Sequence, residues 1–402
     1  MPVQTSRRPH SPDPGSPGRV PPVIPTQPGP GNTGGGGRKR TKRKDPLWAK
    51  LTVIVGAVLM MTSGLAIVGS KAVIGQATSN IKQGNLIGDA GKSDAEGGNS
   101  LDGPIDMLLL GVDARASWDA DDVRSDSIII LHIPASHDQA YLISIPRDTE
   151  ARIPAWSKGG WNGGVEKINA AFQIGARNNG GWEGGAQMMA KTLKSMTGIS
   201  FDGAAIINFG GFKKIIDQLG TVRICVSHTV PSYHMSYVDG KPMWNADAKK
   251  TGKPRTPVVH KKGCREMKGW EALDYARQRH GLPNADYDRQ QNQQQLIKAM
   301  AKRATEKGML TNPLKLNSMM KAAGESLMLD TGKVSMEDLI FTLKGLNGND
   351  LVTLRTNGGT YATNASGREG LNELSMEMFR AVKEDKLADF VVANPNVLST
   401  RK

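Results

Sequence analysis

Aromatic residues, cysteine and histidine are scarce in this sequence of 402 residues: 5% are aromatic, two are Cys and seven are His. The chain also has no G-x-S-x-G elbow, no P-loop and no H-E-x-x-H helix, which argues against α/β-hydrolases, P-loop NTPases and zinc peptidases. No long stretch repeats, and the clusters GGWNGG and GGWEGG indicate only local loop composition. A functional site must therefore use other residue types.

Positive charge is concentrated at the start of the chain. Residues 1–50 contain ten Lys or Arg against two acidic residues, which is +8 of the net charge of +14. Residues 1–37 are rich in Pro, Gly and Ser and cannot bury enough apolar surface to offset the entropy of ordering. We predict a disordered basic tail over 1–50. Its cluster RKRTKRK is typical of a nucleic-acid arm, but the next segment favours a topology signal.

An uncharged apolar run of 19 residues, 51–69, follows the tail. As a helix it is about 28 Å long, close to a hydrocarbon core of roughly 30 Å. Because basic residues precede it, the tail should be cytoplasmic and everything after about Ser70 exported. A cleavable signal peptide is the alternative, but its apolar core is usually only about 7 to 15 residues. We predict an uncleaved signal-anchor, a transmembrane helix over 51–70, in a single-pass type II cell-membrane protein.

Export changes the meaning of the two cysteines. Cys225 and Cys264 both lie in the exported part, where an oxidising environment favours a disulfide. Closing a loop of about 40 residues would stabilise the fold by roughly 4 kcal/mol on the chain-entropy estimate. Two separate buried thiols are the alternative. A zinc site is disfavoured because no histidine spacing supports the pair.

The exported part begins with a polar segment, 71–104, interpreted as a juxtamembrane linker or a weakly ordered domain start. Three apolar runs follow, at 105–113, 127–133 and 140–145, and they suit strands covered on both faces. GAAIINF and TVRICV predict later strands, and the segment 227–268 is expected to be an irregular surface excursion. Helical periodicity predicts helices at 166–176, 186–196, 212–220, from Asp286 onward, 313–329, 336–346 and 370–386.

Strands and helices interleaved in this way predict one α/β domain over 105–390. The expected architecture is an α-β-α sandwich with a central mixed sheet flanked by helices.

Charged residues collect where the predicted strands begin and end. Asp113 closes the first strand, Arg124 and Asp126 open the second, and Arg147 and Asp148 follow the third. Open α/β sheets place their sites outside strand ends. Arginine forks bind phosphate oxygens, and paired carboxylates can bind Mg²⁺ or Mn²⁺, which bridges pyrophosphate oxygens. The set predicts a phosphoryl-transfer site.

More arginines lie in the segment 275–295, which contains Arg277, Arg279 and Arg289 among many amides. Steps of three or four residues from Arg289 pass through Gln293 and Leu296 to Met300, so one helix face changes from polar to apolar. A helix of this kind places its polar end in a site. The alternative is a solvated helix start.

Several stretches resemble, in order and spacing, the LytR-CpsA-Psr family of Gram-positive cell-wall enzymes. They are DMLLLGVDAR, VRSDSIIILHI, SIPRDT, EKINAAF, FGGFKKIIDQLGTV and GWEALDYARQRHGLPNADYDRQQNQQQLI. The resemblance covers about residues 105 to 305. It implies a hydrophobic lipid groove and a membrane-anchored phosphotransferase that moves glycopolymers from a polyprenyl-pyrophosphate carrier to peptidoglycan, with pyrophosphatase as a side activity.

The resemblance also implies roles for single residues. It assigns metal binding to Asp113 and Asp126, and pyrophosphate binding to Arg147, Arg277, Arg279 and Arg289. Further contacts to the head group fall on Lys167, Gln293, Arg124 and Arg152. The chain departs from the family pattern at Asn208, where an acid is common, and at Thr221, where a second glycine is common.

Two other functions stay open at this point. A non-catalytic polyprenyl-phosphate or wall-polymer binding protein would need the arginines but not the metal-binding acids. A DNA-binding attenuator would act through the basic tail, which has no helix-turn-helix pattern, so no nucleic-acid partner is expected. The expected partners are the lipid-linked glycopolymer, the peptidoglycan acceptor and the membrane.

Overall fold

The computed structural model describes residues 81–98, 100–113, 123–309, 312–343 and 345–399. The basic tail and the expected transmembrane segment 51–70 lie outside these residues. Within the described part, no helix is both long and apolar enough to cross a bilayer.

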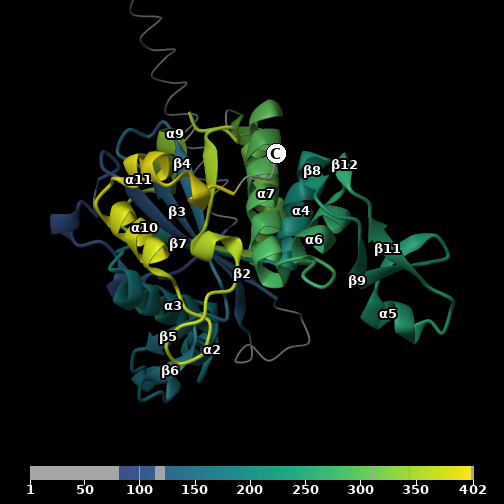
Figure 1. Cartoon of the computed structure of the whole chain (residues 1–402). Helices are drawn as coiled ribbons and strands as arrows, with labels where there is room; N and C mark the ends of the chain where they lie inside the picture. The colour runs from purple at the N-terminus through teal and green to yellow at the C-terminus, as the bar shows by residue number, and fades with distance from the viewer. Residues whose placement is uncertain (1–80, 99, 114–122, 310–311, 344, 400–402) are drawn as a thin grey trace, which may run out of the picture. The chain divides into compact units, whose positions relative to one another are not determined.

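Seven strands form the central sheet in the order β1-β13-β7-β2-β3-β4-β14. Figure 1 labels β2, β3, β4 and β7 among them. β2 pairs in parallel with β7 and antiparallel with β3, β3 and β4 are antiparallel, and β4 and β14 are parallel. The predicted mixed sheet is therefore confirmed. The strands are β1 Lys82–Gln83, β2 Ile105–Val112, β3 Ser125–Ile133, β4 Ala140–Ile145, β7 Gly203–Asn208, β13 Leu327–Asp330 and β14 Leu351–Arg355.

Helices cover both faces of this sheet. Successive residues of a strand point to opposite faces, so Leu108 and Ile128 pack in the large core with helices α2 Ala170–Ala176, α3 Gly181–Thr197 and α10 Glu373–Lys383. On the other face, Leu109 and Ile129 point toward α4 Phe209–Leu219, α7 Ala285–Glu306 and α8 Pro313–Ala323. Helices on both sides make this the expected α-β-α sandwich.

The segment 227–268 is ordered, and the prediction of an irregular excursion is wrong. β9 Val230–Val238 pairs with β10 Lys241–Trp244 and β11 Thr256–His260, and α5 Asn245–Lys250 follows β10. β8 Val222–Val226 pairs with β12 Gly263–Met267, and a disulfide joins Cys225 to Cys264 across these strands, as predicted. We call residues 227–262 the β9 insertion.

Three other predictions need correction. The helix expected over 166–176 begins only at Ala170, because Gly164–Lys167 is β6, which pairs with β5 Glu150–Ile153. The helix expected over 313–329 ends at Ala323, and β13 follows it. The segment interpreted as a linker belongs to the fold from Ile81 onward, since it contributes β1 and the buried Leu86. The remaining helices are α6 Gly269–Arg277, α9 Met336–Leu343 and α11 Leu387–Ala393.

Candidate functional site

A β-bulge between β2 and β3 shapes the charged end of the sheet. Gly111 pairs with Ser127 and Val112 pairs with Ser125, so Asp126 is the extra, unpaired residue. Because a bulge re-aims the side chains beside it, Ser125 is buried while Asp126 faces a pocket of about 330 Å³. The pocket is lined by Asp113, Arg124, Asp126, Arg147, Asp148, Lys167 and Asn169.

An arginine from another element binds each predicted metal ligand. Arg147, after β4, donates from Nη1 to Oδ1 of Asp126 at 2.6 Å, and Arg277, at the end of α6, donates from Nη2 to Oδ2 of Asp113 at 2.9 Å. Burial opposes the charge of Arg147, but the adjacent Asp126 carboxylate prevails and raises the pKa of Arg147. Both acids are thereby neutralised by groups that can also bind phosphate.

Arg289 is the most buried of these arginines, with 6% of its surface exposed. Its Nη2 donates to the backbone oxygen of Asp126 at 2.9 Å and lies 2.8 Å from Oδ1 of Asp286. Burial lowers the pKa of Arg289, and the positive charges of Arg147 and Arg279 lower it further. The carboxylates of Asp286 and Asp126 raise this pKa, but their effect is smaller. Because its charged form is destabilised in this way, Arg289 is stabilised strongly when an anion binds next to it.

Asp286 was not predicted from the sequence. Its Oδ1 lies 3.6 Å from Nε of Arg147 as well as next to Arg289, so one carboxylate connects two arginines from different elements. The available signal was its place three residues before Arg289 in the first turn of a helix, where the two side chains share a face.

Two aromatic rings fix the guanidinium of Arg277. Its Cζ lies 4.1 Å from the ring centre of Phe209, the first residue of α4, and 5.2 Å from that of Trp244, the last residue of β10. Contacts of this kind attract a cation and restrict its orientation. The Trp244 contact had no sequence signal, because it depends on how the β9 insertion folds.

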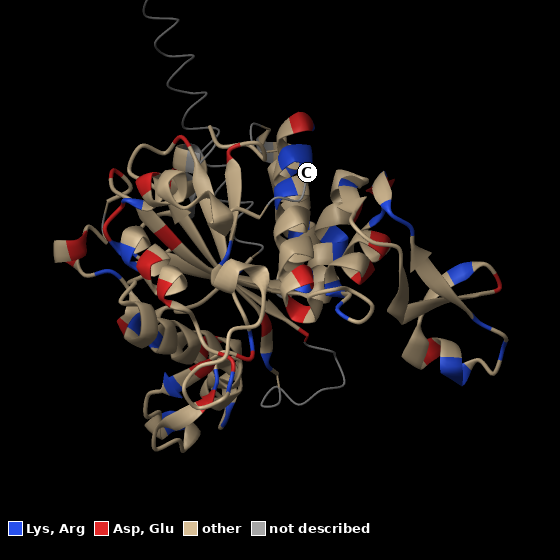
Figure 2. Ribbon diagram, viewed as in Figure 1, with Lys and Arg blue, Asp and Glu red and all other residues tan. Residues whose placement is uncertain are grey.

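The face of α7 changes from polar to apolar along the helix, as predicted. Arg289 is at the charged end, where Figure 2 shows acidic and basic residues intermixed at the start of α7. Gln293, one turn on, accepts a hydrogen bond from Ser127 Oγ at 2.9 Å. Further along, Ile297 and Met300 point into an apolar cavity. The burial of Arg289 argues against a solvated helix start.

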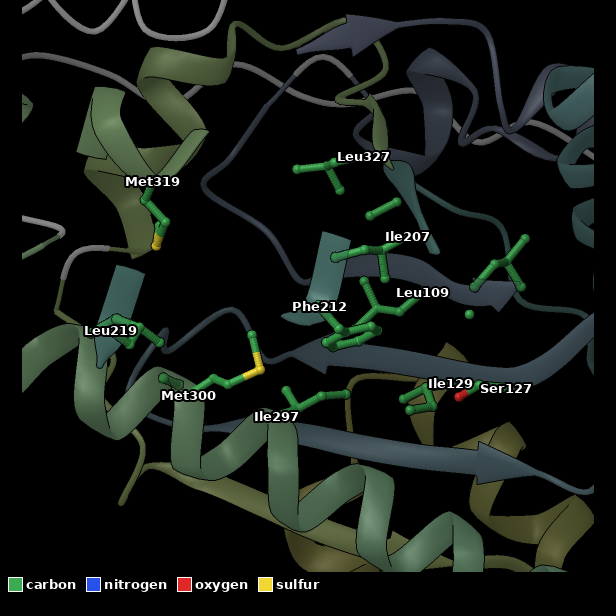
Figure 3. A pocket seen from close by; sticks show the side chains of 15 residues that line it. Leu109, Ser127, Ile129, Ile207, Phe212, Leu219, Ile297, Met300, Met319 and Leu327 are labelled. Atoms are coloured by element: carbon green, nitrogen blue, oxygen red, sulfur yellow. The ribbon is translucent and has the colours of Figure 1, made fainter. Parts of the chain in front are cut away.

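The apolar cavity has a volume of about 310 Å³ and lies between the sheet and helices α4, α7 and α8. Figure 3 shows side chains from all of these elements pointing into it, including Leu109 and Ile129 from the sheet, Phe212 from α4 and Met319 from α8. β2 and β3 connect this cavity to the charged pocket, because Asp113 directly follows β2 and Asp126 lies near the start of the antiparallel β3, at the same end of the sheet.

Of the other residues predicted to contact the head group, Lys167 and Arg124 lie at the charged pocket and Arg152 does not. Lys167 Nζ lies 3.1 Å from Asp148 Oδ1, and Arg124 Nε donates to Gln173 Oε1 at 2.9 Å, both at the charged pocket. Arg152 is exposed on β5, opposite Val165, and does not line the pocket. Asn208, a departure from the family pattern, caps α4 by accepting from the backbone N–H of Gly211.

Asp113 and Asp126 fit a metal ion that binds together with its substrate. Among the residues that the structure describes, no cluster of three or more His, Cys, Asp or Glu could hold a metal alone. Mg²⁺ is commonly bound by one or two carboxylates plus substrate phosphates and water. The charged pocket, in which Asp113 and Asp126 lie with two arginines and a lysine, matches that mode.

Comparisons with known proteins identify the family. A model described as the LytR_cpsA_psr family matches residues 72–384. The cell wall biosynthesis protein LcpA of Corynebacterium glutamicum is 26% identical over 313 residues, 71% of this chain and 55% of LcpA. TagU of Bacillus subtilis, a polyisoprenyl-teichoic acid–peptidoglycan teichoic acid transferase, is 25% identical over 76% of this chain and 85% of TagU.

Solved structures share the fold. A crystal structure of a Streptococcus agalactiae protein has a TM-score of 0.56 at 21% identity, covering 74% of this chain and 91% of that chain. This chain spans about half the length of the C. glutamicum relatives that it matches.

Proposed function

Because the chain belongs to the LytR-CpsA-Psr family, we propose that it is a membrane-anchored phosphotransferase that attaches a glycopolymer from a polyprenyl-pyrophosphate carrier to peptidoglycan. The TagU relatives, named as transferases that join teichoic acid to peptidoglycan, support this class. The anchor at 51–70 and a domain outside the cell are part of the proposal.

One observation supports it above the others: β2 and β3 connect an apolar cavity to a charged pocket. Leu109 and Ile129 line the cavity, and Asp113 and Asp126 line the pocket, on the same two strands. A lipid pyrophosphate has the matching shape, since an apolar chain is joined directly to a polyanion. The arginines bind the pyrophosphate anion, and the apolar cavity excludes water from the part of the lipid chain nearest to the pyrophosphate.

In the proposed transfer, a hydroxyl of the acceptor forms a bond to the phosphorus that bears the sugar. The bond from that phosphorus to the bridging oxygen breaks, and the lipid phosphate leaves with the proton that the hydroxyl gives up. Arg147, Arg277, Arg279 and Arg289 bind the pyrophosphate and stabilise the charge that develops on the leaving group. Lys167, Gln293 and Arg124 contact the head group. Mg²⁺ or Mn²⁺, bound by Asp113 and Asp126 with phosphate oxygens, would supply further positive charge.

The test is transfer from a synthetic polyprenyl-pyrophosphate saccharide to peptidoglycan fragments by the purified full chain. Arg289→Lys keeps the charge but loses the two-pronged geometry, so we expect activity to fall about ten- to a hundredfold. The matched control is Arg303→Lys on the same helix, where the guanidinium binds Thr221 and Glu266. If both substitutions reduce transfer activity only slightly and to the same extent, the result contradicts the proposed site. Donor binding without turnover, with Mg²⁺ present, favours a binding protein instead.

A further inference from the structure

Tyr233 is a large aromatic residue that the fold leaves in solvent. It lies on β9 with 63% of its surface exposed. Its ring packs against His280, with ring centres 4.4 Å apart, and meets His234 edge-on at 5.8 Å. Tyr361 is similarly exposed, at 59%, on the loop between 359 and 373. Exposure combined with a close, tilted ring partner distinguishes Tyr233 from an incidental surface residue.

The backbone of Tyr233 is fixed although its ring is exposed. Its N–H donates to Oε1 of Gln278 at 3.0 Å, and its carbonyl accepts from Nδ2 of Asn245 at 2.9 Å. These side chains come from the segment after α6 and from α5. The ring is therefore presented by two neighbouring elements rather than by a free loop.

Gln278 is held in turn by a buried polar network. Its Nε2 donates to Oδ1 of Asp274 at 3.0 Å, and the same carboxylate accepts from Ser232 Oγ at 2.9 Å and lies 2.7 Å from Nε2 of His260. Asp274, Gln278 and His260 are fully buried. Buried hydrogen bonds of this kind favour one arrangement, because breaking any of them leaves a polar group buried without that partner.

The same network places the ring beside the arginines. Gln278 lies in the chain between Arg277 and Arg279, so the residue that fixes Tyr233 also fixes the backbone between two predicted pyrophosphate ligands. His234, next to Tyr233, has Nε2 at 3.4 Å from the carbonyl oxygen of Arg277. The backbone of Tyr233 and the backbone around Arg277 are thus held by the same set of hydrogen bonds.

We propose that Tyr233 and His280 form a stacking platform for a pyranose ring of the donor glycopolymer, next to the pyrophosphate. The inference rests on the proposed function, because it takes Arg277 and Arg279 as phosphate ligands. A pyranose has a face of C–H groups and a rim of hydroxyls. An aromatic ring can cover the C–H face, while phenol, imidazole and guanidinium groups form hydrogen bonds with the hydroxyls. A sugar esterified to a phosphate at these arginines emerges beside this platform.

The test compares the affinity of the full chain for two soluble probes, N-acetylglucosaminyl pyrophosphate and inorganic pyrophosphate, by calorimetry with Mg²⁺. Tyr233→Ala should lower the preference for the sugar-bearing probe by roughly three- to tenfold, and Tyr233→Trp should preserve it because the aromatic face remains. Tyr361→Ala is the matched control and should leave the preference unchanged. Circular dichroism of each variant checks folding.

Each outcome decides the assignment. An unchanged preference in Tyr233→Ala overturns it, and so does an equal loss for both probes, which indicates damage to the arginine segment. A normal preference with a raised KM for the peptidoglycan acceptor alone assigns the platform to the acceptor and overturns the donor version. If the wild-type chain binds the sugar probe through Tyr233 but transfers nothing, the platform stands and the proposed function fails.

Discussion

At the scale of single residues, Asp286 shows how a charged site is positioned by a group that need not contact the substrate. Its carboxylate lies against both Arg147 and Arg289, and Arg147 in turn binds Asp126. Asp126 on β3, Arg147 after β4 and Arg289 on α7 are therefore connected through one oxygen atom, Oδ1 of Asp286. Removing that charge leaves both arginines in place but less well oriented.

We predict that Asp286→Asn separates binding from turnover. The site becomes more positive, so KM for a lipid pyrophosphate donor should stay constant or fall, whereas kcat should fall about tenfold or more because two arginines lose a charge-assisted contact. Steady-state kinetics measures both values. Glu306→Gln, at the other end of the same helix, is the control. A rise in KM with kcat unchanged contradicts a positioning role.

Neighbouring glutamines on α7 have opposite roles. Gln293 faces the site and binds Ser127, whereas Gln294 is 1% exposed and donates to Leu142 O, Ser144 Oγ and Leu354 O. We expect Gln294→Ala to lower the free energy of unfolding by about 1 to 3 kcal/mol, since it leaves buried acceptors unpaired. Gln293→Ala should instead reduce transfer with little change in stability. Urea denaturation and transfer assays on both variants distinguish the two roles, and the reverse pattern would reject them.

The two glutamines also show where prediction from sequence ends at this scale. The step from Arg289 through Gln293 to Met300 correctly indicated the face toward the site, because helical spacing is a local property. It left the role of Gln294 open, because the partners of that side chain are backbone atoms of β4 and β14, far away in the chain. The helical spacing of Asp286 indicated its contact with Arg289, but it could not indicate the contact with its second partner, Arg147.

At the scale of elements, β2, β3 and β4 were predicted to within two residues from their apolar runs. β13 and β14 were missed. They are only four and five residues long, and their places beside β7 and β4 depend on pairing with strands more than 100 residues away. The β9 insertion was misread for a different reason: its strands pair with near neighbours in the chain, but its many polar, Pro and Gly residues resemble a loop.

The short helix Asp94–Glu96 allows a prediction about pH. Glu96 accepts hydrogen bonds from the backbone N–H and hydroxyl of Ser93 and from Ser200, and these bonds lower its pKa to about 2. A depressed carboxyl pKa stabilises the fold above the unfolded value near 4.5, and this stabilisation is lost as pH falls toward 2. We expect the stability gap between wild type and Glu96→Gln to be widest above pH 4.5 and to close near pH 2. Urea denaturation over this range measures it, and a constant gap would contradict the cause.

At the scale of the whole molecule, much of the site was predictable because it lies at the ends of consecutive strands and in one helix. Asp113, Asp126 and Arg147 come from the ends of β2, β3 and β4, and Arg289 from the start of α7. The parts that stayed hidden join distant segments: Trp244 reaches Arg277 from the β9 insertion, and Tyr233 depends on Gln278. Local patterns indicated which residues carry charge, and only tertiary packing determined which residues orient them.

The Cys225–Cys264 disulfide connects the fold to the proposed location of the chain. Its loop spans 39 residues, and the described chain has no free cysteine. By the chain-entropy estimate, such a bond stabilises the fold by about 4 kcal/mol. It forms and persists in an oxidising compartment, so its state in the cell reports on which side of the membrane the domain lies.

If segment 51–70 anchors the chain with its carboxyl-terminal part outside the cell, both cysteines should be accessible in intact cells after reduction. We expect a membrane-impermeant maleimide to label Cys225 and Cys264 only after treatment with a membrane-impermeant reductant, detected by mass spectrometry of the two peptides. A Ser6→Cys variant provides the control, because a cytoplasmic tail should be labelled only after lysis. Labelling of Ser6→Cys in intact cells reverses the topology. Labelling of the native pair only after lysis, without any reductant, means that the domain is cytoplasmic and that the thiols there are not joined.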